Sequence, residues 1–365
     1  MADPNTIRIL ELDGGGERGY LSLNFFIKFI QQWGIDPATV AANFDVICGT
    51  SIGGILALAL GMGKTPAELL PFFTEDGPYI FSTNGIASNR ATSFDKLLAF
   101  APANPYSGVP FYSTEGTAET YGSNLLASRL QTVFTDSTMG NLLTNVVIPT
   151  YKVSLREDST ISSGTYTLCS NVNIPGFVGQ HELISNVALA TSAAPFYLPS
   201  INLTSLNPND PKYLNGRYLD GALFCNNPSY FGRNLAQILK PTARRCCILS
   251  IGTGLGEMGF DDPNLPEVSL VANSDPIVSV SNLFALFDVA MTGGQETASK
   301  NLYLESTYTI NRVFNYRFQP VLDPSRDTEL DNTDPDILQY YEDVADQWFS
   351  EDIDNINTFI GHLNA

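Results

Sequence analysis

The sequence predicts an α/β fold with a mainly parallel central sheet flanked by helices. Over about the first 75 residues, short apolar stretches alternate with stretches of helical period, a pattern typical of parallel strands joined by crossover helices. Glycine-rich sequence follows three of the predicted strands. Of the 365 residues, 44% are hydrophobic and 16% charged, which excludes a disordered chain and is enough to bury a sizeable core.

The first elements are the clearest. Residues 7–12 and 44–48 are short apolar stretches that we expect to be buried strands. A helical pattern follows each of them, at 20–33 and 52–62. Pro66 then lies where a further helix begins, because proline is favoured in the first helical turn.

The same reading extends to the end of the chain. We expect further strands at 145–153, 164–169, 213–219, 246–251 and 302–318. We expect further helices at 125–134, 183–191, 229–239, 277–300, 334–349 and 351–363. No internal repeat and no clear boundary is visible. The prediction is therefore an α/β domain at 1–255 and a helical and strand extension at 256–365, packed on the same domain.

A loop-rich insertion is expected at 74–122. It is rich in Gly, Pro, Ser, Thr and Asn, yet it contains many aromatic side chains. Among these are Tyr79, Phe81, Phe94, Phe100, Tyr106, Phe111 and Tyr112. So many aromatic residues exclude a simple linker. Two interpretations remain: an ordinary packed excursion, which is a long loop packed on the domain, or a cap over an apolar site.

The chain is acidic, with 19 Lys and Arg against 38 Asp and Glu, and a net charge of −19. This argues against nucleic acid as a partner, since phosphate contacts dominate that affinity. It also gives no electrostatic attraction to anionic bilayers. Twelve acidic residues and a single basic residue lie at 323–354. This acidic tail is interpreted as a solvated helical surface, or alternatively as a partner-binding or membrane-repelling segment.

Residues 46–63 carry no charge and are long enough to suggest a membrane span. They contain five glycines together with Thr50 and Ser51, so we expect a buried strand, a tight turn and a buried helix instead. The N-terminus has no basic region and no early apolar stretch. The expected location is cytoplasmic, with delivery into another cell by a route without a signal peptide left open.

The loop at 13–19 has two interpretations. Read literally, it contains G-x-G-x-x-G between a strand and a helix, and Asp36 or Asp45 could then be the acid that binds the ribose of a dinucleotide. Alternatively, its backbone N–H groups at a helix start could bind another anion, including a transient oxyanion.

The second glycine-rich site favours the oxyanion. Gly49, Ser51 and Gly53 form G-x-S-x-G between a predicted strand and a small-residue helix. This is the nucleophile elbow, in which a sharp turn exposes the serine hydroxyl above the sheet. The two glycines leave room for the backbones to approach.

A serine nucleophile needs a base. The chain has two histidines, His181 before a predicted helix and His362 near the C-terminus, and both fit ordinary polar or surface positions. The sequence therefore offers no histidine in a motif that would suit a Ser-His-Asp triad. Asp220 follows an apolar strand and precedes two small residues; it is either a turn residue or a desolvated general base. No His, Cys, Asp or Glu residues have metal-ligand spacing, so no metal is expected.

Four sequence blocks resemble those of the patatin-like phospholipases. The blocks are Asp13-Gly14-Gly15-Gly16-Glu17-Arg18-Gly19, Gly49-Thr50-Ser51-Ile52-Gly53-Gly54, Ala190-Thr191-Ser192-Ala193-Ala194-Pro195 and Asp220-Gly221-Ala222. Their order and spacing also match, and the resemblance spans roughly 7–255. The C-terminal part resembles the family less clearly.

The resemblance implies a variant of the α/β-hydrolase arrangement with a Ser-Asp dyad, no metal and no cofactor. Ser51 would be the nucleophile and Asp220 the base, and Arg18 would stabilise the glycine loop. The oxyanion hole would be formed by the N–H groups of Gly14, Gly15 and Gly16. Ala222 departs from the glycine that many members have there, which changes little.

The implied function is a lipid acyl hydrolase that releases fatty acids from phospholipids or related acyl lipids through an acyl-enzyme. Its partners would be the acyl lipid and, transiently, a membrane surface. Four alternatives stay open. They are a transacylase, a regulated toxin or defence enzyme that needs a protein activator, a non-catalytic lipid-binding protein on the same fold, and an NAD-dependent enzyme.

Overall fold

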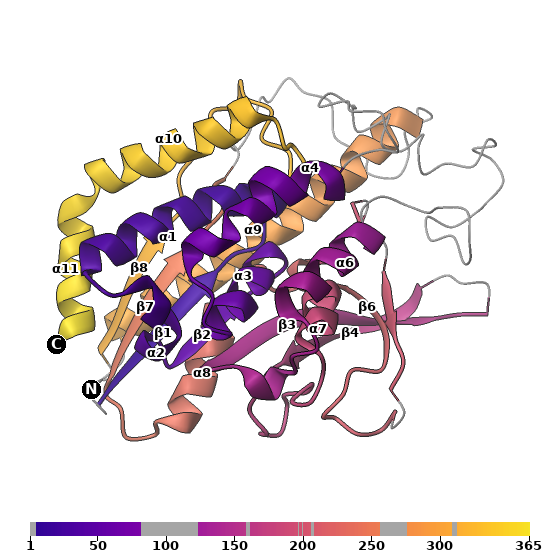
Figure 1. Cartoon of the computed structure of the whole chain (residues 1–365), viewed down its shortest axis with the longest axis horizontal. Helices are drawn as coiled ribbons and strands as arrows, with labels where there is room; N and C mark the ends of the chain where they lie inside the picture. The colour runs from indigo at the N-terminus through magenta and orange to yellow at the C-terminus, as the bar shows by residue number, and fades with distance from the viewer. Residues whose placement is uncertain are drawn as a thin grey trace.

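The computed structural model describes residues 5–81, 123–157, 161–195, 197–198, 200–205, 208–255, 276–308 and 312–365 (Figure 1). Most of the insertion expected at 74–122 lies outside these ranges, so the choice between a packed excursion and a cap does too. In the described part of the chain, no helix combines the length and apolar character that a membrane span requires.

An eight-stranded mixed sheet forms the centre of the molecule, in the order β5-β6-β3-β2-β1-β7-β8, with β4 paired to β3. Five strands are mutually parallel: β1 (Thr6–Leu12), β2 (Val46–Gly49), β3 (Asn145–Leu155), β7 (Arg245–Ile251) and β8 (Arg312–Phe318). Three pair in antiparallel fashion: β4 (Ile161–Cys169), β5 (Ile201–Leu203) and β6 (Gly216–Asp220). The predicted α/β class with a mainly parallel sheet is confirmed.

Helices cover both faces of the sheet. The α-helices are α1 (Gly19–Trp33), α2 (Val40–Asn43), α3 (Ile52–Gly61), α4 (Gly77–Ile80), α6 (Ser123–Phe134), α7 (Ile184–Thr191), α8 (Ser229–Leu239), α9 (Pro276–Tyr308), α10 (Pro335–Glu351) and α11 (Ile353–Asn364). Shorter turns are η1 (Gly16–Arg18), η2 (Pro37–Thr39), η3 (Pro66–Leu69), the π-helical η4 (Phe72–Asp76), η5 (Met139–Asn141) and η6 (Gly221–Leu223).

The core lies on two sides of the sheet because side chains alternate along each strand. Along β1, Leu10 and Leu12 join the larger core cluster with α1, α3, α10 and α11. Ile7 and Ile9 join the smaller cluster with α8 and Leu302 of α9. In Figure 1, α10 runs alongside α1, and the two helices pack together.

Strand β3 brings the two halves of the site together. Its first residues pair with β2, in the register Val147 to Cys48, and its later residues pair with β6, in the register Thr150 to Asp220. Strand β4 occupies the opposite edge of β3, so β2 and β6 lie along the same edge. One is parallel and the other antiparallel to β3, and their C-terminal ends therefore meet at Pro149.

The prediction of a strand at 302–318 is wrong in its first half. Helix α9 continues to Tyr308, and β8 begins only at Arg312. Between residues 289 and 305 of α9, the buried residues are Met291, Gln295, Ala298 and Leu302, and this spacing is the helical period. Their burial against the rest of the fold outweighs the strand propensity of the local sequence. Strand β5 was not predicted, and β6 begins at Gly216 rather than at 213.

Candidate active site

The turn between β2 and α3 holds Ser51 in a strained backbone conformation. Ser51 has φ 56° and ψ −127°, which places it among the few non-glycine residues with positive φ in the described part of the chain. The flanking backbones are very close. A Cβ on Gly53 would lie 2.2 Å from the carbonyl oxygen of Leu12, and one on Gly49 would lie 2.2 Å from that of Gly53. These contacts give the two glycines of G-x-S-x-G a steric reason.

Thr191 fixes the turn from the side of α7. Its hydroxyl accepts a hydrogen bond from the Ser51 N–H at 3.0 Å and donates one to the carbonyl oxygen of Pro149 at 2.6 Å. Pro149 is the point on β3 where β2 and β6 meet. The block that contains Thr191 was noticed in the sequence, but a role for this hydroxyl could not be assigned without the fold.

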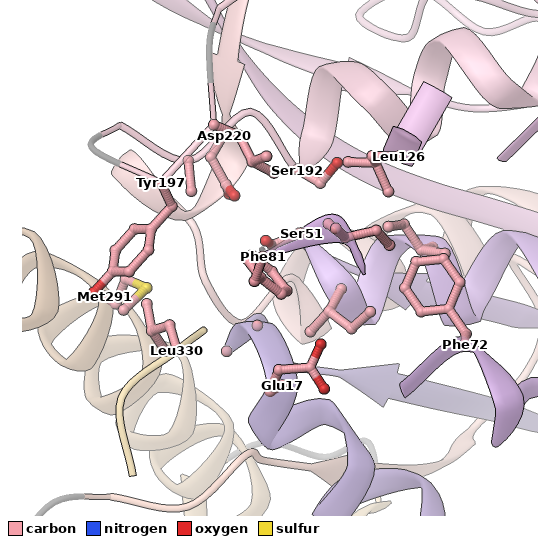
Figure 2. A pocket seen from close by; sticks show the side chains of 17 residues that line it. Glu17, Ser51, Phe72, Phe81, Leu126, Ser192, Tyr197, Asp220, Met291 and Leu330 are labelled. Atoms are coloured by element: carbon pink, nitrogen blue, oxygen red, sulfur yellow. The ribbon is translucent and has the colours of Figure 1, made fainter. Parts of the chain in front are cut away.

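Asp220 ends β6 and is buried, with 1% of its surface exposed. Its Oδ1 accepts a hydrogen bond from the Ala222 N–H at 2.7 Å. Oδ2 has no well-formed hydrogen bond within the described residues. Burial raises the pKa of the carboxyl to about 7, although the Ala222 N–H and the Ser51 hydroxyl oppose this rise. Figure 2 shows the carboxyl directed toward Ser51.

The glycine loop after β1 lies against the serine turn, since a Cβ on Gly14 would be 3.0 Å from the Cβ of Ser51. The Gly14 N–H already donates to Oδ1 of Asn226 at 3.1 Å. No hydrogen bond of the Gly15 or Gly16 N–H occurs in the ranges that the structure describes, and both glycines line the cavity beside Ser51. Of the three glycines, Gly14 is thus held in place by Asn226, whereas Gly15 and Gly16 face the cavity.

A buried ionic network supports the loop from below, and sequence reasoning missed it. Arg317 of β8 donates to both carboxyl oxygens of Asp13, at 3.0 Å to Oδ1, and to the hydroxyl of Ser250 at 2.8 Å. Asn227 also donates to Oδ1 of Asp13, at 2.9 Å. Glu11 lies in the same network, where burial and the charge of Asp13 raise the pKa of its carboxyl.

Arg18 was expected to stabilise the glycine loop. Its backbone N–H does donate to the carbonyl oxygen of Gly15 at 3.1 Å. Its side-chain Nε has no hydrogen-bond partner among the described residues, and its charge acts on Tyr341 of α10. The ionic support of the loop that the structure displays comes from Arg317.

A mainly apolar cavity of about 600 Å³, part of it open to solvent, lies above Ser51 (Figure 2); we call it the catalytic cavity. Its described lining consists of Gly15, Gly16, Glu17, Ser51, Ile52, Ile55, Phe72, Ile80, Phe81, Leu126, Ser192, Ala194, Tyr197, Leu198, Asp220, Met291 and Leu330. Glu17 is buried, and burial and the charge of Asp331 raise the pKa of its carboxyl. The lining suits an apolar substrate with one polar reacting group.

Neither histidine is part of this lining. His181 is exposed and packs edge-on against Tyr213, with ring centroids 5.9 Å apart. His362 stacks on Phe314 at 3.8 Å and contacts the first residues of β7 through its carbonyl oxygen. That is the opposite end of the strands from Ser51. Within the described ranges, no group of three or more His, Cys, Asp or Glu is placed to hold a metal ion.

Comparison with known proteins agrees with this geometry. The profile of the patatin-like phospholipases matches residues 10–230. The chain belongs to the patatin-like phospholipase family. The matched region includes the glycine loop, Ser51 and Asp220, and it ends before β7, so Arg317 lies outside it.

Several curated relatives are similar over most of the family region. A cGAMP-activated phospholipase of Vibrio cholerae serotype O1 is 32% identical over 234 residues, 62% of this chain and 57% of that protein. A second cGAMP-activated phospholipase, of Escherichia coli strain TW11681, is 27% identical over 350 residues, 92% of this chain and 87% of that protein. The human calcium-independent phospholipase A2-gamma is 27% identical over 349 residues, 92% of this chain and 38% of that protein.

Among solved structures, human GIVD cytosolic phospholipase A2 is similar with a TM-score of 0.44 and 13% identity, covering 99% of this chain and 61% of that chain.

Proposed function

We propose that this patatin-like protein is a lipid acyl hydrolase with a Ser51–Asp220 dyad. The observation that carries the proposal is the pairing of a strained, cavity-facing serine with a buried carboxyl whose pKa is raised to about 7, with no histidine in the described lining. The apolar cavity around the pair favours an acyl chain as the occupant.

The chemistry follows from the positions of these groups. Oδ2 of Asp220 takes the hydroxyl proton as Ser51 Oγ attacks the ester carbonyl carbon, and the N–H groups of Gly15 and Gly16 stabilise the oxyanion. Ser51 is the N-cap residue of α3, so the positive end of this helix dipole adds to the stabilisation. As the C–O bond breaks, the leaving alcohol takes the proton from Asp220. Water then attacks the acyl-enzyme and gives a proton to Asp220. As the bond between the acyl carbon and Ser51 Oγ breaks, Asp220 returns this proton to Oγ and the fatty acid is released.

The test combines labelling with product analysis. Wild-type protein should react with a fluorophosphonate and release fatty acids from a panel of phospholipids and galactolipids. Ser51→Ala should lose both properties, while Ser192→Ala, at another serine of the same cavity, should keep the labelling. Persistent labelling of Ser51→Ala would overturn the nucleophile assignment.

Transacylation is the second candidate on the same site, since it differs only in the group that attacks the acyl-enzyme. The product analysis separates the two activities when a lipid alcohol such as a monoacylglycerol is added. A new acyl ester in place of free fatty acid would identify a transacylase.

We also propose that a small activator controls turnover. Two of the relatives above carry the name cGAMP-activated phospholipase, and Ser51 and Asp220 are only 8% and 1% exposed. Hydrolysis should therefore be measured with and without cGAMP and with cell extract. Equal rates under all these conditions would contradict the requirement for an activator.

A further inference from the structure

A second cavity adjoins the catalytic cavity along helix α3. It has a volume of about 660 Å³, part of it open to solvent, and we call it the outer cavity. Its described lining is Ile55, Leu56, Ala59, Lys64, Glu68, Leu69, Pro71, Phe72, Asp76 and Val133. Ile55 and Phe72 line both cavities, so these two side chains form the wall that the cavities share.

The two cavities follow one face of α3. Ser51 and Ile55 are one helical turn apart, and Ala59 lies one turn further on the same face. Ile55 is therefore about 6 Å, and Ala59 about 12 Å, along the helix axis from Ser51. A chain attached to Ser51 that follows this face meets the shared wall first and the outer cavity next.

Of the two wall residues, Phe72 is the one that can be altered without disturbing the core. Ile55 belongs to the buried core helix and is 5% exposed. Phe72 is half-buried and begins the π-helical turn η4. Its neighbour Phe73 is fully buried and anchors that turn, with its ring 5.7 Å from Tyr20. Figure 2 shows Phe72 at the opposite end of the catalytic cavity from Tyr197 and Met291.

We propose that Phe72 is the residue that determines acyl-chain length, as a wall across an apolar channel that runs from Ser51 along α3 into the outer cavity. The acyl chain occupies the end of the catalytic cavity that is lined by Ile55, Leu126 and Phe72. The alcohol part of the substrate occupies the other end, which is lined by Tyr197 and Met291. This inference rests on the proposed acyl-hydrolase function. It adds where the chain lies and what limits its length.

The test is the dependence of kcat/KM on chain length, measured with p-nitrophenyl esters of saturated acids from butyrate to stearate, with and without cGAMP. Phe72→Ala should move the preferred ester toward longer chains and raise the palmitate-to-octanoate ratio of kcat/KM by at least about tenfold, since single methylenes in an apolar pocket already discriminate to that degree. Phe72→Trp should move the preference toward shorter chains. Phe72→Ala with Val133→Phe, which refills the outer cavity, should lose the gain.

Met291→Ala is the matched control, because Met291 lines only the other end of the catalytic cavity. It should leave the preferred chain length unchanged. If the esters are hydrolysed in a Ser51-dependent way but both Phe72 variants change all chain lengths by the same factor, the inference is overturned and the proposed function stands. If the wild-type protein hydrolyses none of the esters under any condition, the proposed function is overturned and the inference with it.

Discussion

Burial is what would make Asp220 effective in its proposed role as general base. A solvated aspartate is a weak base near neutral pH, whereas desolvation at the end of β6 raises the pKa of this carboxyl to about 7. A general base is most effective when its pKa lies near the working pH. The same burial that would make Asp220 a useful base also lowers the free energy of unfolding when the carboxyl is charged.

We expect kcat/KM for a soluble ester to fall as pH is lowered through about 7, because Asp220 must be deprotonated to accept the Ser51 proton. Above about pH 7, Asp220→Asn should reduce activity by about 10²–10⁴, the usual contribution of a positioned base. The difference from wild type should narrow as pH falls, because wild-type Asp220 is then protonated. His181→Ala and His362→Ala are the controls and should stay near wild type. If His181→Ala lost activity as completely as Ser51→Ala while folded, a histidine would be the base.

Stability should show the opposite dependence on pH. Folded Asp220 keeps its proton up to about pH 7, while the unfolded residue loses it near the ordinary aspartate pKa of 3.8. Between these values the folded state binds more protons, so this group makes the free energy of unfolding decrease as pH rises. Asp220→Asn should therefore be more stable than wild type at pH 8, by roughly a few kcal/mol. Thermal unfolding of both proteins at pH 5 and pH 8 measures this, and an equal difference at both values would contradict it.

At the scale of elements, the glycine loop depends on β8 at the far edge of the sheet. Arg317 forms its bidentate ion pair with Asp13 from 304 positions away in the sequence. This pair holds the start of the loop whose next residues, Gly15 and Gly16, are the proposed oxyanion donors. Arg317 is therefore a positioning residue rather than a catalytic one.

Arg317→Met should lower the free energy of unfolding by about 3–5 kcal/mol, because it leaves buried carboxylates unpaired. It should also lower kcat more than it raises KM, since the oxyanion contacts act mainly in the transition state. Arg317→Lys should fall between, because lysine cannot form a bidentate pair. Arg312→Met, an exposed arginine at the start of the same strand, is the control. A variant with a lower melting temperature but wild-type kcat would show that the network serves stability alone.

At the scale of the whole molecule, the acidic tail forms two amphipathic helices, α10 and α11, that pack on the rest of the fold. The buried residues of α10 and α11 are Ile337, Leu338, Tyr341, Ala345, Ile356, Phe359, Ile360 and Leu363. They pack against α1 and β8, and acids such as Asp343, Asp346 and Glu351 are exposed. This arrangement supports the interpretation of the acidic run as a solvated helical surface.

Ending the chain at residue 334 should therefore prevent folding. Each fully buried large apolar side chain contributes about 1.5–3 kcal/mol, and the whole stability of a domain is only about 5–15 kcal/mol. Circular dichroism and the yield of soluble protein measure the effect. Asp343→Asn with Glu351→Gln, which changes only exposed acids, should melt within a few degrees of wild type. A truncated protein with wild-type melting behaviour would contradict the packing role of the tail.

The sequence by itself determined the features that depend on neighbouring residues, namely the strands, the helices and the turn at Ser51. Strand and helix periods predict the α/β class, and the glycines around Ser51 predict a turn because only glycine tolerates such close backbones. Asp220 could be selected by elimination, since the two histidines occur outside any motif. These features depend on residues within a few positions of one another.

The tertiary structure decided what depends on distant residues. It makes β2 and β6 converge on β3, engages the Gly14 N–H with Asn226 from 212 positions away, and brings Arg317 to Asp13. It also keeps residues 302–308 helical, because Leu302 is buried at the helical spacing of α9. No local pattern specifies these outcomes, since the register between strands and the partners of buried polar groups are fixed only when the whole sheet assembles.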